Sequence, residues 1–326
     1  MEAGTTASLS APVLAGIVSF SATLVLFKNR SLPLDKPNER SLHAVPVPRT
    51  GGMAIMGGIL AAALLLRAAP AIVVPAVVLA VISYFDDRHA LPVSVRLATH
   101  LLAAAVFLWG SGMAPGIAMI VLVLAIGWLI NLYNFMDGSD GLAGGMAVIG
   151  FGAYGVAAAM GDAQPLALLS WSIAAAACGF LAFNFAPAKI FMGDVGSIAL
   201  GFLAGAIGVA GWCESAWPLW FPLAVFAPFI VDASVTLVRR ALRSEQIWQA
   251  HRSHYYQRLI LSGWSHRRTA LWEYALMLTC AAFALVARDA SAKLVAGTIA
   301  ALVAVVLAAM WAVDRRWKHF EASTSA

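Results

Sequence analysis

The sequence carries little charge for its length. Of 326 residues, only 11% are charged and 61% are hydrophobic. Soluble domains contain roughly 25% charged and 45–50% apolar residues, and a soluble core stops growing near about 250–300 residues. The composition therefore excludes an ordinary soluble fold and predicts a protein that lies in the lipid bilayer.

Cysteines and clusters of basic residues are also scarce. The three cysteines lie in or beside apolar segments at no metal-ligand spacing, so they predict small core residues and no disulfide framework. The net charge of +5 includes no basic run with interleaved aromatic residues, so no nucleic-acid partner is expected. No Lys or Arg precedes Lys28. The N-terminus thus lacks the positive region of a cleavable signal, and the first apolar segment is predicted to be a retained span.

The apolar residues fall into segments that can cross a bilayer, because a membrane helix needs about 20 residues, with a range of about 17–25. The eleven segments are Ala11–Phe27, Gly51–Leu66, Ala71–Phe85, Val95–Trp109, Gly116–Phe135, Leu142–Met160, Leu166–Phe185, Ile198–Trp212, Leu219–Val238, Thr269–Ala287 and Leu294–Val313. Several must extend into flanking residues. The sequence predicts an all-α integral membrane protein of about eleven transmembrane helices, with one domain over residues 1–326.

The basic residues predict which way the chain faces. With the N-terminus outside, the inside segments are 28–50, 86–96, 136–141, 186–197, 239–268 and the C-terminal tail. These contain all of the 21 Lys and Arg residues except Arg67, Arg288 and Lys293. Basic residues concentrate in the cytoplasmic loops of membrane proteins. We therefore predict that the N-terminus is outside and the C-terminus inside.

The acidic residues divide unevenly in this orientation. Those inside, or at the inner ends of spans, are Asp86, Asp87, Asp137, Asp140, Asp194 and Asp232. Charged residues at membrane depth cost about 2.5–3.5 kcal/mol on insertion scales and tend to mark function. Carboxylates gathered on one face would repel one another without a cation, and an oxygen-only ligand set suits Mg²⁺. We therefore predict a magnesium site on the inner face.

The densest polar motif begins at Asn131 and ends at Gly145. Asn131, Asn134, Asp137 and Asp140 recur at every third residue, which on a helix predicts one slowly drifting polar stripe. The alternative is a polar loop between two spans, which would also be rich in Asp and Gly. The two asparagines in the preceding helix favour a functional motif.

Two shorter motifs place carboxylates at the ends of spans. Asp194 lies in a glycine-flanked loop just before a span, where Gly196, Ser197 and the free N–H groups of the next helix could hold phosphate. Asp86 and Asp87 end another span. Adjacent helical side chains point about 100° apart, so both cannot serve one ligand equally. The alternative is a solvated helix end.

The longest inside loop, 239–268, contains His251-Arg-Ser-His-Tyr-Tyr-Gln-Arg258. Its His, Arg and Tyr donors suit pyrophosphate. The alternative is an ordinary basic loop attracted to anionic lipid.

Taken in this order, the motifs resemble those of the polyprenyl-phosphate N-acetylhexosamine-1-phosphate transferase superfamily. The resemblance runs from about Arg40 to Arg268 and includes Arg40-Ser-Leu-His43 and Pro46-Val-Pro-Arg49-Thr-Gly-Gly52. The superfamily includes bacterial enzymes that start O-antigen and teichoic acid synthesis and the peptidoglycan translocase. It implies a multi-pass protein of the bacterial inner (cytoplasmic) membrane, with a periplasmic N-terminus and a cytoplasmic active site.

The resemblance also implies a role for each matching residue. Asp194 matches the principal Mg²⁺ ligand, and Mn²⁺ could replace Mg²⁺. Asp86 and Asp87 match paired aspartates that activate the lipid phosphate, with Asp87 also supporting the metal. His254 completes the implied catalytic set. The implied substrate-binding residues are Arg49, Asn134, Asp137, Asp140, Asn184, Phe191, His251 and Arg258, among which Phe191 matches a residue that stacks on uracil.

One motif departs from the superfamily pattern. Related sugar-phosphate transferases show His-x-His-His-Arg in the last loop, whereas this chain has His254-Tyr-Tyr-Gln-Arg258. A role that needs the missing histidines cannot be carried over. The departure argues against the peptidoglycan translocase, whose loop is rich in histidine, and favours the branch that starts O-antigen or a related surface glycan.

The reaction implied by the resemblance is transfer of a sugar 1-phosphate of the GlcNAc, GalNAc or FucNAc type. The donor would be a UDP-N-acetylamino sugar, the acceptor undecaprenyl phosphate, and UMP would be released. The alternative from another class is a secondary transporter. Transporters place intramembrane carboxylates near the bilayer midplane in repeated halves, whereas here the acids lie at the inner boundary without a visible repeat. The sugar remains open, as does a homodimer.

Overall fold

The chain is almost entirely helical. A computed structural model describes residues 2–29, 34–35, 42, 46–89, 91–246, 249 and 251–324, with side chains from residue 10 onward. The elements within these residues are α1 (Glu2–Lys28), β1 (Leu34–Asp35), β2 (Val47–Pro48), α2 (Gly51–Leu66), α3 (Pro70–His89), α4 (Val93–Gly110), α5 (Ile117–Phe135), α6 (Leu142–Met160), α7 (Gln164–Asn184), α8 (Asp194–Cys213), α9 (Trp220–Val225), α10 (Ala227–Leu242), α11 (Tyr255–Leu261), α12 (His266–Ala287) and α13 (Ala292–Thr324). The motif residues Arg40 and His43 lie outside the described residues.

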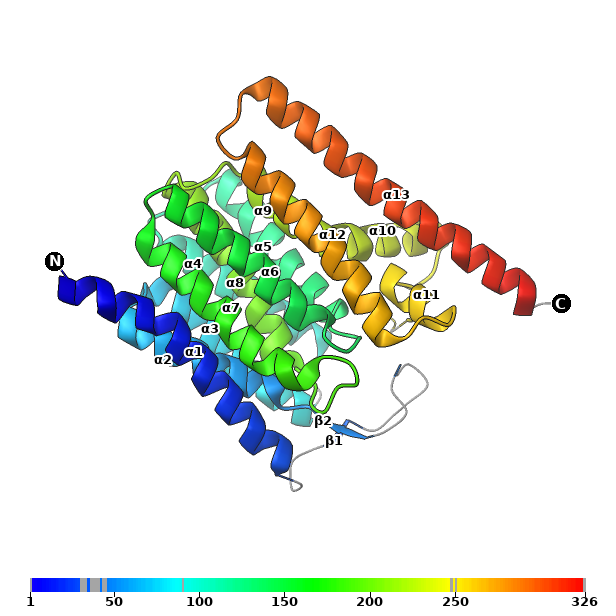
Figure 1. Ribbon diagram of the computed structural model, residues 1–326, viewed down its shortest axis with the longest axis horizontal. Coiled ribbons are helices and arrows are strands. Elements are labelled where there is room, and N and C mark those ends of the chain that lie inside the picture. Colours follow the sequence, from blue (N-terminus) through cyan, green and yellow to red (C-terminus); the bar gives the residue numbers. More distant parts are fainter. Residues whose placement is uncertain are drawn as a thin grey trace.

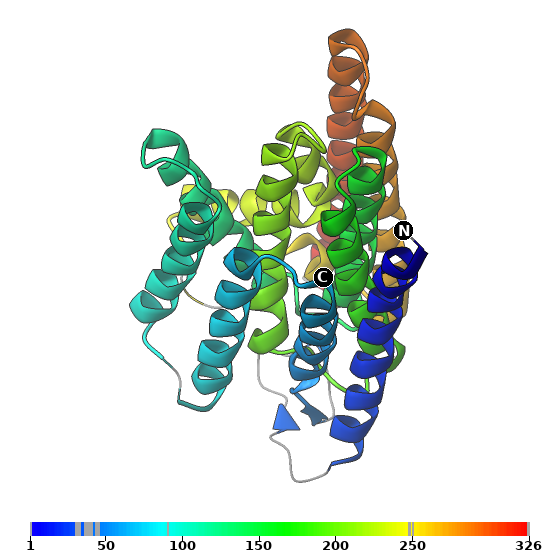
Figure 2. The same ribbon diagram turned by 90° about the vertical axis from the view of Figure 1, so that its left-hand side faces the viewer.

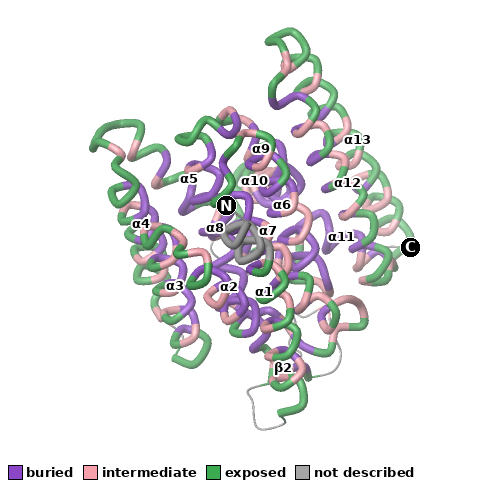
Figure 3. The backbone as a smooth tube through the Cα atoms, turned by 60° about the vertical axis from the view of Figure 1, so that its left-hand side comes forward, coloured by how far each residue is buried: buried purple, intermediate pink, exposed green. Residues whose placement is uncertain are grey.

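The helices pack as one bundle with α8 at its centre (Figure 1). α8 contacts α2, α3, α4, α5, α6, α7 and α9. In its most apolar 18-residue stretch, 89% of the residues are buried, compared with 17% in that of α13. Its Gly- and Ala-rich sequence explains this position, because small residues let neighbouring helices approach closely in a membrane. The tube in Figure 3 is accordingly purple through α8 and mostly green along α13.

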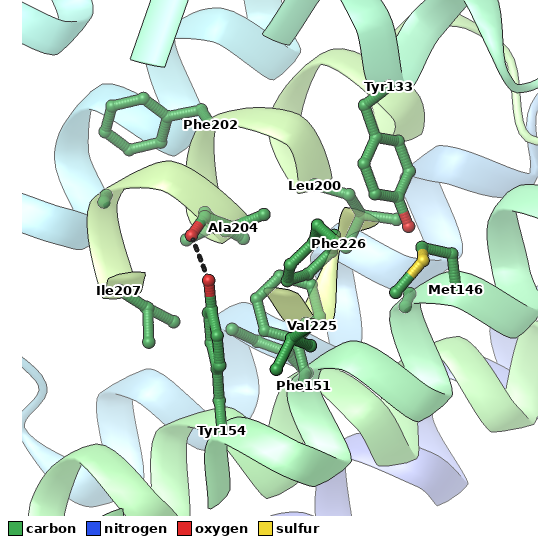
Figure 4. Close-up of a cluster of buried hydrophobic side chains, with 14 of the residues drawn as sticks. Tyr133, Met146, Phe151, Tyr154, Leu200, Phe202, Ala204, Ile207, Val225 and Phe226 are labelled. Carbon is green, nitrogen blue, oxygen red and sulfur yellow. Dashed lines mark hydrogen bonds between the residues drawn. The ribbon is translucent and has the colours of Figure 1, made fainter. Parts of the chain in front are cut away.

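An aromatic cluster fills the centre of the bundle (Figure 4). Tyr154 donates its hydroxyl hydrogen to the carbonyl oxygen of Ala204 at 3.1 Å, which satisfies a buried polar group. The rings of Phe151 and Phe226 lie 5.9 and 5.4 Å from that of Tyr154, centroid to centroid. The cluster therefore joins α6, α8 and the junction between α9 and α10.

The helical fold confirms the predicted fold class. Among the described residues, nine helices are long and apolar enough to cross a membrane. α2 matches a predicted span but has only 16 residues, about 24 Å at 1.5 Å per residue. The predicted span Leu219–Val238 is wrong as one helix, because it divides into α9 and α10 at Phe226. Pro228, in the first turn of α10, has no N–H to continue the hydrogen-bond ladder from α9.

Two of the eleven predicted spans are not among these nine helices. They are the segment that forms the short α2 and the segment that divides into α9 and α10, so the number of passes through the membrane stays a prediction. β1 and β2 lie at one end of the bundle, the lower end in Figure 2. The five predicted inside loops all gather there through the contacts described below. Which side of the membrane this end faces remains the prediction from charge.

Candidate active site

The first inside loop is attached to the segment before α8. The backbone N–H of Phe191 donates to the carbonyl oxygen of Pro48 at 2.8 Å, and the N–H of Gly52 donates to that of Met192 at 2.8 Å. Two motifs about 140 residues apart in the sequence thus run side by side. This pairing brings Arg49 to the start of α8.

Asp194 joins three of the predicted motifs. Its Oδ1 accepts hydrogen bonds from Arg49 Nη2 at 2.5 Å and from Asn134 Nδ2 at 3.0 Å. The same amide nitrogen lies 2.9 Å from Ser197 Oγ. Because α2, α5 and α8 each supply or flank a partner, the position of this carboxylate is fixed by three separate helices.

Two N–H groups in the first turn of α8 are already hydrogen-bonded. The N–H groups of Gly196 and Ser197 donate to the carbonyl oxygen of Gly193 at 3.0 and 3.1 Å. Gly193 adopts a φ of +71°, a conformation that glycine reaches without strain. The N–H groups of Gly196 and Ser197 are therefore not free to hold phosphate, and a phosphate site at the start of α8 stays a prediction.

The two adjacent aspartates at the end of α3 have different surroundings. Asp87 Oδ1 lies 3.5 Å from Arg49 Nη2. Asp86 is buried, accepts a hydrogen bond from the N–H of Leu91 at 2.7 Å, and lies 3.4 Å from Arg96 Nη1. This confirms that the pair cannot serve one ligand equally and places Asp87 at the site.

The polar stripe expected from Asn131 to Asp140 does not form on one helix. α5 ends at Phe135, and Asp137 and Asp140 lie in the following turn. Asn131 bonds the carbonyl oxygen of Gly127 one helical turn earlier, at 2.7 Å. The glycines that follow Asp137 and Asp140 favour a turn over continued helix, so the predicted stripe is wrong although its last three polar residues reach the same site.

The turn after α5 is tied to the loop after α7. Asp140 Oδ2 accepts a hydrogen bond from the N–H of Ala188 at 2.9 Å. Asn184 accepts one from the N–H of Gly141 at 3.0 Å and donates to the carbonyl oxygen of Ile190 at 2.9 Å. Asn184 therefore bridges two of the predicted loops.

Asp137 lies near two other carboxylates and Arg49. Burial raises the pKa of Asp137 well above its ordinary value; Arg49 opposes this shift, while Asp194 and Asp87 add to it. A carboxylate with a raised pKa costs stability when it ionises. A further cation at this position would relieve that cost, as expected of a metal or substrate site.

A polar cavity of about 430 Å³ lies beside Asp194. The predicted residues that line it are Arg49, Asn134, Asp137, Asp140, Asn184, Phe191, Asp194 and His251. A second cavity of about 210 Å³ is lined by Arg49 and Asp87, together with Tyr84 and Arg88. Arg49 belongs to both walls and so stands between the two cavities.

Three predicted residues line neither of these two cavities. Asp86 faces Arg96, as described above. His254 is buried, with Nδ1 3.1 Å from Asp232 Oδ1. Arg258 Nη1 donates to Asp314 Oδ1 at 2.9 Å. Roles for these three in substrate contact stay predictions.

Tyr256 and Gln257 of the last-loop motif also line the cavity, as does His266, which the sequence did not single out. His266 Nδ1 lies 3.0 Å from Ser139 Oγ, and its Nε2 lies 3.1 Å from the carbonyl oxygen of Leu42. The ring therefore joins three loops. In the sequence it follows a basic loop at the start of a span, where a histidine gives no specific signal.

His251 gives a pH prediction. Burial, then nearby His254 and Arg240, lower its pKa to about 4. The folded protein therefore leaves it neutral between about pH 4 and pH 6.5, where the unfolded chain would bind a proton. Its contribution to stability is thus lost as the pH falls through this window. We expect His251→Gln to match the unaltered protein in melting temperature at pH 7.5 and to exceed it at pH 5; equal pH dependence of the two proteins would contradict the assignment.

Known proteins resemble this chain over most of its length. The family model described as glycosyl transferase family 4 matches residues 69–211. A probable undecaprenyl-phosphate N-acetylglucosaminyl 1-phosphate transferase of Bacillus subtilis is 30% identical over 79% of this chain and 78% of its own. A decaprenyl-phosphate N-acetylglucosaminephosphotransferase of Mycolicibacterium smegmatis is 32% identical over 73% and 71%. A phospho-N-acetylmuramoyl-pentapeptide-transferase of Listeria welshimeri is 34% identical, over only 44% of each chain.

The chain therefore belongs to glycosyl transferase family 4, which confirms the resemblance inferred from its motifs. The matched region ends within α8 and includes Asp87, Asn134 and Asp194. The protein is a multi-pass membrane transferase.

Proposed function

We propose that this protein transfers an N-acetylamino-sugar 1-phosphate from a UDP-sugar to undecaprenyl phosphate and releases UMP. The observation that carries the proposal is the position of Asp194, held by Arg49 and Asn134 beside a polar cavity. The names of the Bacillus and Mycolicibacterium relatives support a polyprenyl phosphate acceptor. The product would start a cell-surface polysaccharide such as O-antigen on the cytoplasmic face of the inner membrane.

The larger cavity suits the donor. Its wall offers the ring of Phe191 for a base and the side chains of Asn134, Asn184 and His251 for hydrogen bonds. Arg49 brings a guanidinium group, whose planar donors match phosphate oxygens. A UDP-sugar has all of these complementary parts: a planar base, a pyrophosphate and a polar sugar.

An apolar cleft offers a place for the lipid tail. Its volume is about 280 Å³, and its lining includes Leu129 and Leu132 of α5, Leu223 of α9 and Ile230 of α10. Leu132 lies two residues before Asn134 in α5, so the cleft leads towards the site end of the bundle. The break between α9 and α10 shapes one wall.

The proposed transfer is a single displacement at phosphorus. An acceptor phosphate oxygen forms a bond to the β-phosphorus of the UDP-sugar, and the bond from that phosphorus to the oxygen shared with the α-phosphorus breaks. The electron pair leaves with UMP. Asp87 would orient the acceptor phosphate, and Arg49 would hold phosphate oxygens as charge develops in the transition state.

The residues at the site fit Mg²⁺. The donors are hard oxygens. The negative charges of Asp194 and Asp87 both raise the pKa of Asp137. Within the described ranges, no set of three His, Cys, Asp or Glu side chains has the arrangement of a complete metal site. Mg²⁺ typically takes one or two carboxylates and completes its shell with water and substrate phosphates, so Asp194 and Asp87 would suffice. The ion would neutralise charge on the pyrophosphate.

A panel of donors tests the proposal. Purified protein would be given undecaprenyl phosphate, Mg²⁺ and, in turn, UDP-GlcNAc, UDP-GalNAc, UDP-N-acetylfucosamine and UDP-MurNAc-pentapeptide, with UMP and lipid product measured. We expect product with one of the first three. Product from UDP-MurNAc-pentapeptide alone would identify a peptidoglycan translocase, and donor binding without UMP release would contradict the proposed transfer.

Removal of divalent ions is expected to stop the reaction. Chelation with EDTA should lower UMP release by at least about 100-fold, because loss of several kcal/mol of charge stabilisation has that effect on a rate. Added Mg²⁺, and also Mn²⁺, should restore it. Unchanged turnover after chelation and dialysis would exclude this use of Asp194 and Asp87.

A further inference from the structure

Asp232 is a buried carboxylate for which the proposed reaction has no use. It lies in α10 and is 6% exposed. An isolated buried charge is costly, so it must be compensated by hydrogen bonds. Its hydrogen-bond partners, and the cavity that some of them line, indicate its role.

Among the residues that the structure describes, the hydrogen bonds to Asp232 come from the last loop and from one neighbour on α10. Asp232 Oδ1 lies 3.1 Å from His254 Nδ1 and accepts the N–H of Tyr255 at 3.0 Å, while Oδ2 accepts the N–H of Tyr256 at 3.2 Å. Thr236 donates its hydroxyl hydrogen to Oδ1 at 3.2 Å. One carboxylate thus fixes three consecutive residues at the start of α11.

The residues so fixed form one wall of the donor cavity. Tyr256 and Gln257 line it directly. The Tyr256 hydroxyl donates to the carbonyl oxygen of Phe135 at 3.1 Å, and the side chain of Gln257 accepts the N–H of His254 at 3.1 Å. His251 lines the same cavity with its ring 4.8 Å from that of His254, centroid to centroid.

His254 transmits the position of Asp232 to this wall. Its ring is stacked on that of Tyr256 at a centroid distance of 5.9 Å and an interplanar angle of 14°. A carboxylate that accepts the Nδ1 hydrogen sets both the tautomer and the orientation of an imidazole. His254 is therefore held between Asp232 and the rings that reach the cavity.

A second carboxylate holds the other side of α11. Asp314 of α13 accepts hydrogen bonds from Arg258 at 2.9 Å and from Arg239 at 2.9 and 3.0 Å. Neither Asp314 nor its two arginine partners line the donor cavity. Asp314 therefore stabilises α11 as a whole, whereas Asp232 sets the residues at its cavity end.

We propose that Asp232 is a positioning residue for donor recognition, which sets His251, Tyr256 and Gln257 in the cavity through His254 and the backbone of α11. This rests on the proposed function, because the donor is taken to be a UDP-sugar. In this role, Asp232 influences both the affinity of the protein for the donor and its preference between donor sugars. The hydrogen-bond partners of Asp232 do not include Asp87 or Asp194, to which the acceptor phosphate and the metal are assigned.

Asp232→Asn is the direct test, because the amide keeps the shape but turns an NH₂ group towards donors of the loop. We expect the KM for the preferred UDP-sugar to rise by about tenfold or more, since a hydrogen bond to a charged group contributes at least that factor. The ratio of kcat/KM between UDP-GlcNAc and UDP-GalNAc should change. The KM for undecaprenyl phosphate should stay the same.

Thr236→Val is the matched control. It removes a hydrogen bond to the same carboxylate from the same helix, and keeps the hydrogen bonds between Asp232 and the loop. It should lower the melting temperature without a change in donor KM or donor preference. An equal rise in donor KM for Thr236→Val, or a folded Asp232→Asn protein with unchanged donor KM and preference, would overturn the proposal.

A binding measurement separates this inference from the proposed reaction. UDP-GlcNAc with Mg²⁺ would be titrated into each protein, and the dissociation constant measured from the shift in melting temperature. Weaker binding in Asp232→Asn than in Thr236→Val supports the role of Asp232 even if no UMP is released, a result that would contradict only the proposed transfer. Equal binding in all three proteins would overturn the role of Asp232 whatever the turnover.

Discussion

Replacement of Asp194 by asparagine is expected to reduce UMP release by at least about 1000-fold. The loss corresponds to several kcal/mol, the usual contribution of a metal to charge stabilisation in the transition state. Asparagine has the same shape and can still bond the side chain of Asn134, which lies 3.0 Å from the carboxylate. The protein should therefore fold, and initial rates with UDP-sugar, undecaprenyl phosphate and varied Mg²⁺ measure the effect.

Arg49→Gln distinguishes a metal ligand from a mere ion-pair partner. If Asp194 acted only by holding Arg49, which is 2.5 Å away, the two single variants and the double variant would lose the same activity. We expect instead that only Asp194→Asn alters the dependence on Mg²⁺. Asp162→Asn, in the turn after α6, is the control and should have full activity. Near-normal turnover by Asp194→Asn would remove Asp194 from the proposed reaction.

The helices were predictable from the sequence because apolar length is a strong signal in a chain that must satisfy its backbone hydrogen bonds within lipid. The break at Phe226 was not, because the residues on both sides of it are apolar and hydropathy does not register backbone direction. Pro222 and Pro228 were the available signals. Proline is tolerated inside membrane helices often enough that its presence alone predicts no break.

The site was predictable where charge is rare. Asp87, Asp137 and Asp194 stood out because a carboxylate near lipid is energetically costly and tends to mark function. The structure brings all three close to Arg49. His266 stood among ordinary basic residues and could be recognised only from its contacts. His254 and Arg258 matched a family motif, yet their partners Asp232 and Asp314 are distant in sequence. The motif therefore could not show that these two side chains bind carboxylates and do not line the cavity.

Gly52→Ala is expected to separate the first loop from α8 and to lower activity by about 100-fold. A Cβ on Gly52 would lie 2.2 Å from the backbone nitrogen of Gly196 and 2.6 Å from its Cα. These are backbone atoms and cannot rotate aside. Overpacking of this kind costs about 1–3 kcal/mol, so the melting temperature should also fall. Displacement of Arg49 by about 1 Å would account for the loss in rate.

Gly57→Ala tests whether the effect belongs to the contact or to glycine in α2. Gly57 lies in the same helix, and a Cβ there would meet no atom within 4 Å. Alanine is favoured over glycine within a helix by about 0.5–1 kcal/mol, so this variant should be active and at least as stable as the unaltered protein. If Gly52→Ala were equally active, the loop that carries Arg49 could not lie against Gly196. Since that contact and the backbone hydrogen bonds beside it bring Arg49 to Asp194, the arrangement proposed for catalysis would fail with them.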